Sequence, residues 1–228
     1  MTKLLLEHGA EINAGDGKAL YEAAVMGHLE IAKHLVDRGA YINTSGEKAL
    51  QEAAKMDDLS MAKRLLEYGA RVNASGGREL KLAVSRGYLE MAKLLLEGGA
   101  DANLVWSAAA PRKPELVRLL LEYGAGVNHC DDFGETVLHK AARTAPAETV
   151  RLLLEHGAEV DLVNNEDGTA LLQAARFGNE KNALLLLEKG AKPDIVDKFG
   201  NTALSLAADS GCKDLVSSLS NLLVDWEK

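Results

Sequence analysis

Apolar residues recur along the chain with a long period. A leucine-rich segment that ends in Gly-Ala appears seven times, and its glycines are Gly9, Gly39, Gly69, Gly99, Gly124, Gly157 and Gly190. The successive spacings between these glycines are 30, 30, 30, 25, 33 and 33 residues. A period of this length indicates a repeat architecture, in which each unit buries its apolar face against its neighbours.

The fifth copy predicts what one unit looks like. Thr136 is placed to cap a short helix in which Leu138, Ala141 and Ala142 share one apolar face. A second helix, apolar on the face that packs back, follows at residues 148–155. Gly157 then ends this helix, because the position after a helix favours the left-handed conformation that glycine adopts without strain. The pattern therefore predicts an all-α solenoid of stacked helix-turn-helix units.

Composition and charge narrow the classes of function. Apolar residues make up 47% of the chain and aromatic residues only 4%, so thin helices of Ala and Leu supply the core. The net charge of −8 argues against nucleic-acid binding, because phosphates require a basic face. No apolar run approaches the roughly 18 residues that span a bilayer, and residues 1–7 are too short and acidic for a signal peptide. With two distant cysteines, these features predict an intracellular protein, cytoplasmic or nuclear, without membrane insertion.

The repeats resemble those of the ankyrin-repeat family. Residues 134–142 and 200–208 are the closest copies of its Thr-Pro-Leu-His-x-Ala signature, and residues 27–35 match its inter-helix turn and second helix. The resemblance covers essentially the entire chain and implies an ankyrin-repeat solenoid with β-hairpin fingers. We interpret residues 1–228 as one domain with a partial repeat (1–9), three short-finger repeats (10–39, 40–69, 70–99), an atypical repeat (100–124), two full repeats (125–157, 158–190) and a C-terminal capping repeat (191–228).

Finger length is expected to differ along the chain. In the last three repeats, nine residues separate the Asn or Asp after Gly-Ala from the leucine of the next helix. The same interval is six residues in the first three repeats and one residue in the fourth. Short β-hairpin fingers are therefore expected mainly in the C-terminal repeats. Residues 111–114 replace the usual turn with a segment that holds two prolines, so residues 100–115 are interpreted as a break between two blocks of repeats.

No catalytic or metal-binding arrangement is apparent in the sequence. Residues 129–132 (His-Cys-Asp-Asp) are adjacent and do not supply the spaced ligands of a structural zinc site. The histidines occupy repeat-equivalent positions, and none is paired with a nucleophile and an orienting acid. No Gly-rich phosphate loop occurs. We therefore expect no enzyme activity, no metal and no cofactor.

The asparagines that follow Gly-Ala form a further motif. They are Asn13, Asn43, Asn73, Asn103 and Asn128. Their surroundings resemble ankyrin segments that an asparaginyl hydroxylase modifies, so the resemblance implies hydroxylation at these positions. The alternative is that each asparagine only hydrogen-bonds its own turn.

The family resemblance also implies a binding surface, a concave groove made by the finger tips and the exposed face of the first helices. By position its residues are Val25, Met26, Lys55, Met56, Ser85, Arg86, Trp106, Phe133, Arg143, Thr144, Arg176, Phe177, Lys198 and Phe199. Lys55, Arg86, Arg143 and Arg176 predict a groove that is locally basic on an acidic protein. We expect it to hold an acidic or amphipathic segment of a partner protein or peptide, bound by a monomeric scaffold or adaptor.

Trp106 and the start of the chain leave alternatives open. Trp106 stands where the family signature has His, and it either fills the gap left by the missing finger or anchors a partner. A pocket for a small molecule or a reaction would have to lie at this break. The chain begins inside a second helix, so either it was cut from a longer array or the protein exposes an incomplete repeat. We favour the first interpretation, under which the repeats could be the targeting arm of a larger protein as an alternative to a free-standing scaffold.

Overall fold

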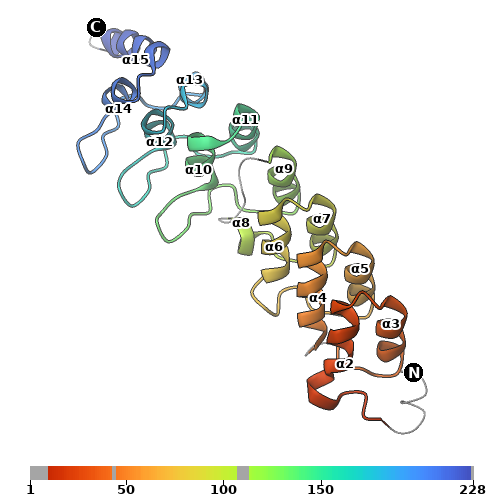
Figure 1. Cartoon of the computed structure of the whole chain (residues 1–228). Helices are drawn as coiled ribbons and strands as arrows, with labels where there is room; N and C mark the ends of the chain where they lie inside the picture. The colour runs from red at the N-terminus through yellow and green to blue at the C-terminus, as the bar shows by residue number, and fades with distance from the viewer. Residues whose placement is uncertain (1–9, 43–44, 107–112, 227–228) are drawn as a thin grey trace. The chain divides into compact units, whose positions relative to one another are not determined.

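The computed structural model describes residues 10–42, 45–106 and 113–226, and these residues are mainly α-helical (Figure 1). The helices in chain order are α2 (Ala14–Val25), α3 (Leu29–Asp37), α4 (Ser45–Met56), α5 (Leu59–Glu67), α6 (Arg78–Arg86), α7 (Leu89–Glu97), α8 (Asn103–Trp106), α9 (Pro114–Glu122), α10 (Val137–Thr144), α11 (Ala147–Glu155), α12 (Ala170–Arg176), α13 (Glu180–Glu188), α14 (Ala203–Asp209) and α15 (Lys213–Trp226). They divide between two compact units, Met1–Ala108 and Ala109–Lys228. The all-α repeat solenoid expected from the sequence is confirmed.

The N-terminal unit consists of two rows of helices. The first helices of its repeats, α2, α4 and α6, pack side by side, and the second helices α3, α5 and α7 form the other row (Figure 1). The leucines that fill the space between the rows repeat every 30 residues and are essentially inaccessible: Leu20, Leu50 and Leu80 from the first row, Leu35, Leu65 and Leu95 from the second. Burial of one such side chain contributes about 1.5–3 kcal/mol.

The C-terminal unit repeats this two-row arrangement. Its first helices, α10, α12 and α14, pack in sequence, as do the second helices α9, α11, α13 and α15. Leu138 and Leu171 of the first row and Leu153 and Leu186 of the second are all buried. Asn182 of α13 is also buried, and its side-chain amide donates to the carbonyl oxygens of Ala141, Ala142 and Ala145 at 2.9–3.3 Å.

The first helices begin differently in the two units. In the C-terminal unit, Thr136, Thr169 and Thr202 have extended backbone, and each hydroxyl accepts from the backbone N–H three residues later. This is the usual N-terminal cap of a helix. The equivalent positions of the N-terminal unit hold Lys18, Lys48 and Arg78. The caps of α2 and α6 there, Asn13 and Gly77, make no side-chain capping bond.

The connections that precede the first helices also differ, as Figure 1 shows by long loops ahead of α10, α12 and α14. In the N-terminal unit the chain turns sharply through left-handed residues: φ is 60° at Gly15, 57° at Asp16 and 77° at Gly17. The difference in connection length therefore agrees with the residue count. The fingers, however, are loops built around Asx turns: between residues 129 and 202 a single antiparallel bridge, Cys130 with Thr136, pairs the chain as a strand would.

Neighbouring fingers of the C-terminal unit are hydrogen-bonded to each other. The N–H of Asn165 donates to the carbonyl of Phe133, and the N–H of Lys198 donates to the carbonyl of Glu166, both at 3.0 Å. Within each finger, Asp131, Asn164 or Asp197 accepts two backbone N–H groups of its own turn. The finger tips are therefore held in a defined position relative to the next finger.

The boundary between the units falls at residues 108 and 109, inside the segment interpreted as a break. Residues 107–112 of that segment, and the partial repeat at residues 1–9, lie outside the described residues. The single-domain interpretation and the repeat boundaries given above remain predictions.

Candidate protein-interaction surface

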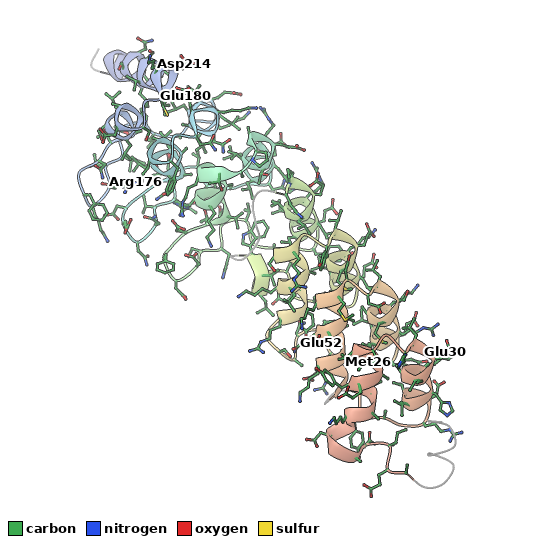
Figure 2. All side chains as sticks on the ribbon, viewed as in Figure 1. Met26, Glu30, Glu52, Arg176, Glu180 and Asp214 are labelled. Atoms are coloured by element: carbon green, nitrogen blue, oxygen red, sulfur yellow. The ribbon has the colours of Figure 1, made fainter. Side chains whose placement is uncertain are left out.

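The predicted groove residues of the N-terminal unit lie at the ends of its first helices. Val25, Met26, Lys55, Met56, Ser85 and Arg86 end α2, α4 and α6. Met26 is 64% exposed and Met56 58% exposed. Figure 2 shows Met26 and Glu52 on the row of first helices, while Glu30 belongs to α3 in the other row.

The predicted groove residues of the C-terminal unit come from helix ends and fingers. Arg143 and Thr144 end α10, and Arg176 and Phe177 end α12. Phe133, Lys198 and Phe199 lie in fingers. Arg176 lies on the side of α12 from which the fingers extend (Figure 2), and its guanidinium contacts the finger residue Asp197.

The basic character expected at four of these positions is corrected at three of them, where a carboxylate lies next to the cation. Arg143 forms an ion pair with Glu135, and Arg176 lies 2.6 Å from Asp197. Lys55 lies 3.1 Å from Glu52, and Arg86 donates to the backbone carbonyl of Lys55. The carboxylates cancel the positive charge of Lys55, Arg143 and Arg176, so these residues organise the surface more than they charge it.

Asp197 shows how tightly one finger is organised. Its side chain is only 2% exposed, and its carboxylate accepts from the backbone N–H groups of Phe199 and Asn201 and from the Asn201 side chain. Burial by itself raises the pKa of Asp197, but the hydrogen bonds from Asn201 and Phe199 together with Arg176 hold that pKa below its usual range. The ionised carboxylate therefore fixes the backbone that carries Phe199.

The three phenylalanines of the chain are all exposed on the C-terminal unit. Phe133 is 73% exposed and Phe199 65% exposed on their fingers, and Phe177 is 57% exposed after α12. The guanidinium of Arg143 lies over the Phe177 ring, 5.6 Å from its centroid. We call Phe133, Phe177 and Phe199 the phenylalanine surface.

The N-terminal unit carries cations that sequence reasoning missed. Lys18, Lys48, Arg78 and Lys81 are exposed, and none forms an ion pair with another described residue. These cations line two open hollows on the row of first helices. One of about 300 Å³ is lined by Lys18, Lys48, Tyr21 and the turn at Gly15 and Asp16; the next, of about 490 Å³, is lined by α4 and α6 and holds Lys55, Arg78 and Lys81. The signal in the sequence was a basic residue at every thirtieth position, 18, 48 and 78.

Glu79 of α6 is a buried carboxylate whose two oxygens form no hydrogen bond with a described residue. Its side chain has no exposed surface. Burial raises the pKa of Glu79, because a carboxylate is poorly stabilised away from water. Gln51 lies close enough to favour the ionised form, but its amide nitrogen donates to Ser75 Oγ at 2.6 Å.

His139 and Asp131 have structural partners. The Nδ1 of His139 accepts from the backbone N–H of Thr136, and its Nε2 lies 3.0 Å from the carbonyl of Gly168 in the next finger. Burial lowers the pKa of His139. Asp131 accepts from two N–H groups of its finger and lies 2.7 Å from Lys140. Across the described parts of the chain, no three His, Cys, Asp or Glu side chains are grouped to hold a metal ion.

The asparagines after Gly-Ala link one repeat to the next. The amide of Asn13 donates to the carbonyl of Gly39 and its oxygen accepts from the N–H of Tyr41. The same pair of bonds joins Asn73 to Gly99 and Asp101, and Asn128 to Gly157 and Glu159. Asn103 bonds Asp101 of its own turn, and Asn43 lies outside the described residues. The expectation that each asparagine bonds its own turn is thus wrong for three of them, and hydroxylation stays a prediction.

Trp106 has no exposed surface. It ends the short helix α8, which follows Asp101 almost directly because the fourth repeat lacks a finger. A ring that is completely covered offers no area to a partner, so the interpretation of Trp106 as a surface anchor is corrected. The ring is core packing at the missing finger.

Comparison with models of protein families matches the ankyrin repeat. The model for ankyrin repeats in three copies matches residues 41–105 and 104–197, and the model for a single ankyrin repeat matches residues 19–47. A search of curated protein sequences found no significant match. No helix in the described ranges is long and apolar enough to cross a membrane. Ankyrin repeats are generally protein–protein interaction modules and typically non-enzymatic. Because these models match most of its length, the chain belongs to the ankyrin-repeat family.

Proposed function

We propose that the chain is a non-catalytic scaffold that binds an amphipathic segment of a partner protein on the phenylalanine surface. The observation that carries this proposal is that all three phenylalanines are more than half exposed, while the core of the same unit is built from Leu, Val and Ala. Aromatic residues are enriched in interfaces because each buries a large apolar area with little loss of conformational freedom. Three of them on one unit favour a binding role over chance exposure.

The backbone that carries two of the three phenylalanines is fixed by hydrogen bonds within the fingers, which supports the proposal. The N–H of Phe133 donates to Asp131 and the N–H of Phe199 donates to Asp197, each at 3.0 Å. The Phe177 ring is covered on one face by Arg143, which is itself paired with Glu135. Rigid anchors lose less entropy on binding, so a surface organised in this way supports a higher affinity than mobile side chains would.

The partner segment is expected to be amphipathic. Its apolar side chains would cover the three rings, and an acidic residue would approach Lys198, which projects from the same finger as Phe199 and donates to the carbonyl of Asn165 at 2.6 Å. The same surface serves whether the chain acts alone or as the targeting arm of a larger protein.

The test is a comparison of two triple variants in affinity capture from a cell lysate, with quantitative mass spectrometry. Phe133→Ser/Phe177→Ser/Phe199→Ser removes the phenylalanine surface. Leu59→Ser/Leu89→Ser/Tyr123→Ser removes three other exposed apolar side chains, 37–40% exposed, and serves as the matched control. Circular dichroism checks that both variants keep the helical signal of the parent protein.

We expect a protein that the parent and the control capture and that the phenylalanine variant loses. Binding of that purified protein should then weaken by about a hundredfold or more, since the loss of three interface side chains at about 1 kcal/mol each totals about 3 kcal/mol. Equal capture by all three proteins, with circular dichroism unchanged, would contradict the proposal.

A further inference from the structure

The row of first helices in the N-terminal unit carries two consecutive hollows with unpaired cations. The first lies between α2 and α4, and the second between α4 and α6. Lys18, Lys48, Arg78 and Lys81 line them and form no ion pair with a described residue. We call these four residues and the two hollows they line the basic groove.

Acidic residues in the basic groove do not balance these cations. The lining residues include two carboxylates, Asp16 in the first hollow and Glu52 in the second. Glu52 already forms an ion pair with Lys55, 3.1 Å away. The groove therefore keeps excess positive charge on a chain whose net charge is −8.

Helix α6 contributes most to this imbalance. Its exposed charged residues are Arg78, Lys81 and Arg86, all cations. Its only acidic residue, Glu79, is completely buried, and burial raises the pKa of that carboxyl and so weakens its tendency to carry a negative charge. The solvent side of α6 is thus positive.

We propose that the basic groove binds an extended, acidic segment of a partner protein, with carboxylates of the segment paired to Lys18, Lys48 and Arg78. This inference rests on the interaction function proposed above and adds a second surface of different chemistry on the other unit. Charge complementarity identifies the occupant, because an apolar segment would leave four cations without partners.

The spacing of the cations specifies the segment further. Lys18, Lys48 and Arg78 occupy the same position on three successive first helices. Packed helices lie about 8–10 Å apart, and an extended chain rises about 3.3 Å per residue. An extended segment that crosses α2, α4 and α6 therefore meets the three cations with every third residue. The expected pattern is an acidic residue followed by two others, repeated at least three times.

The probe is a fluorescein-labelled peptide of four Glu-Gly-Ser repeats, and its control is the same peptide with Gln in place of Glu. Fluorescence polarisation with the full chain measures the dissociation constant at low and moderate salt. The test variant is Lys18→Gln/Lys48→Gln/Arg78→Gln. The matched control, Lys33→Gln/Lys63→Gln/Lys93→Gln, removes three exposed lysines with the same 30-residue spacing from the second helices α3, α5 and α7.

We expect the Glu peptide to bind the parent chain and the control variant, and the test variant to bind it about tenfold more weakly, because each exposed ion pair contributes modestly. The affinity should fall with salt. Absence of binding to the parent chain, equal losses in both variants, equal binding of the Gln peptide, or full competition by millimolar inorganic phosphate would overturn the proposal.

The two proposals fail separately. The variant that lacks the phenylalanine surface should bind the Glu peptide as the parent does. If it does, while lysate capture shows no protein that depends on the phenylalanines, the basic groove stands and the phenylalanine surface does not. Loss of peptide binding in that variant would overturn the assignment of the peptide to the basic groove.

Discussion

The two units of this chain share the same pattern of buried leucines. They differ in how their first helices are capped and in which partners their charged side chains have. Both bury leucines from two rows of helices at a constant period. In the C-terminal unit, threonines cap the first helices, and the cations on that face, such as Arg143 and Arg176, have carboxylate partners. In the N-terminal unit the equivalent helix starts carry Lys18, Lys48 and Arg78, which have no such partners among the described residues.

Finger length explains the difference. Three of the carboxylates that pair with cations in the C-terminal unit, Asp131, Glu135 and Asp197, belong to fingers, and their partners lie on the first helices. The third connection of the N-terminal unit, residues 74–77, is Ala-Ser-Gly-Gly and contains no acid. The first two connections keep one acid each, Asp16 and Glu47. A connection shorter by three residues thus leaves the leucine core intact, and in the third repeat it also leaves no acid ahead of α6. The comparison shows that core and surface chemistry are set by separate parts of one repeat.

The largest expected effect is at the repeat position that holds His139 in the C-terminal unit and Gln51 in the N-terminal unit. His139→Leu should lower the free energy of unfolding by about 2–3 kcal/mol, because it leaves the buried N–H of Thr136 and the carbonyl of Gly168 without their partner. Leucine itself fits this position, since Leu172 occupies it in the next repeat and is buried. Gln51→Leu, at the same position of the N-terminal unit, should cost less than about 1 kcal/mol.

Urea unfolding followed by circular dichroism measures both variants. A similar loss for His139→Leu and Gln51→Leu would show that the polar network of the fingers contributes no more than the short turns do. The side chains at this position would then contribute equally to the stability of the two units.

A somewhat smaller effect is expected at the short turn before α6. Gly77 has φ +71°, and a Cβ there would lie 3.0 Å from the Cβ of Leu104. Gly76 has φ +65° but open space around it. Gly77→Ala should therefore cost about 2 kcal/mol, from backbone strain and crowding together, and Gly76→Ala about 1 kcal/mol from backbone strain alone. Equal losses in thermal unfolding would mean that Leu104 moves aside freely.

A third prediction concerns pH, which should affect the two units in opposite directions. The raised pKa of Glu79 means that the folded N-terminal unit holds this proton more tightly than the unfolded chain does. Its contribution to stability is complete below the unfolded pKa of about 4.3 and is lost as the pH rises through the folded pKa. The lowered pKa of His139 has the other sign: its contribution is complete above about 6.5 and is lost as the pH falls through the folded pKa.

Hydrogen exchange with mass spectrometry separates the units, since peptides from α6 and α10 report local stability. After correction for intrinsic exchange, protection of α6 should rise as the pH falls through the folded pKa of Glu79 toward about 4.3, and protection of α10 should fall as the pH drops below about 6.5. Glu79→Gln should abolish the rise in α6 and stabilise the N-terminal unit at neutral pH by about 1 kcal/mol. A rise that persists in Glu79→Gln would assign the effect to another group.

The fold was largely predictable from the sequence, because leucine spacing and C-terminal glycines act locally. The period of the leucine-rich segments that end in Gly-Ala predicted the stacked helix pairs, and the count of residues before Leu138 predicted a long connection. The Asx turns of the fingers were not predicted as such, since the choice between a strand pair and a turn depends on which N–H groups Asp131 accepts. These bonds join residues two and four positions apart and leave no period in the sequence.

The candidate surface was less predictable, because position in a repeat gives exposure but not partners. Phe133, Phe177 and Phe199 were correctly expected to be exposed. Arg143 and Arg176 were expected to carry free charge, but their acids lie 8 and 21 residues away in sequence and meet them only in the fold. Lys18, Lys48 and Arg78 recur with a 30-residue period that is visible in the sequence, but only the fold shows that they pair with no acid among the described residues.

The smallest expected effect tests whether a threonine cap can be moved between the units. Thr202→Val should cost about 1 kcal/mol, because the Thr202 hydroxyl accepts from the N–H of Ser205 at 3.1 Å and its backbone is extended. Lys48→Thr should not raise the free energy of unfolding by a similar amount. Lys48 lies within α4, so threonine there replaces a better helix former and should cost about 0.5 kcal/mol. A gain in stability for Lys48→Thr would show that the extended finger is not what makes the cap work.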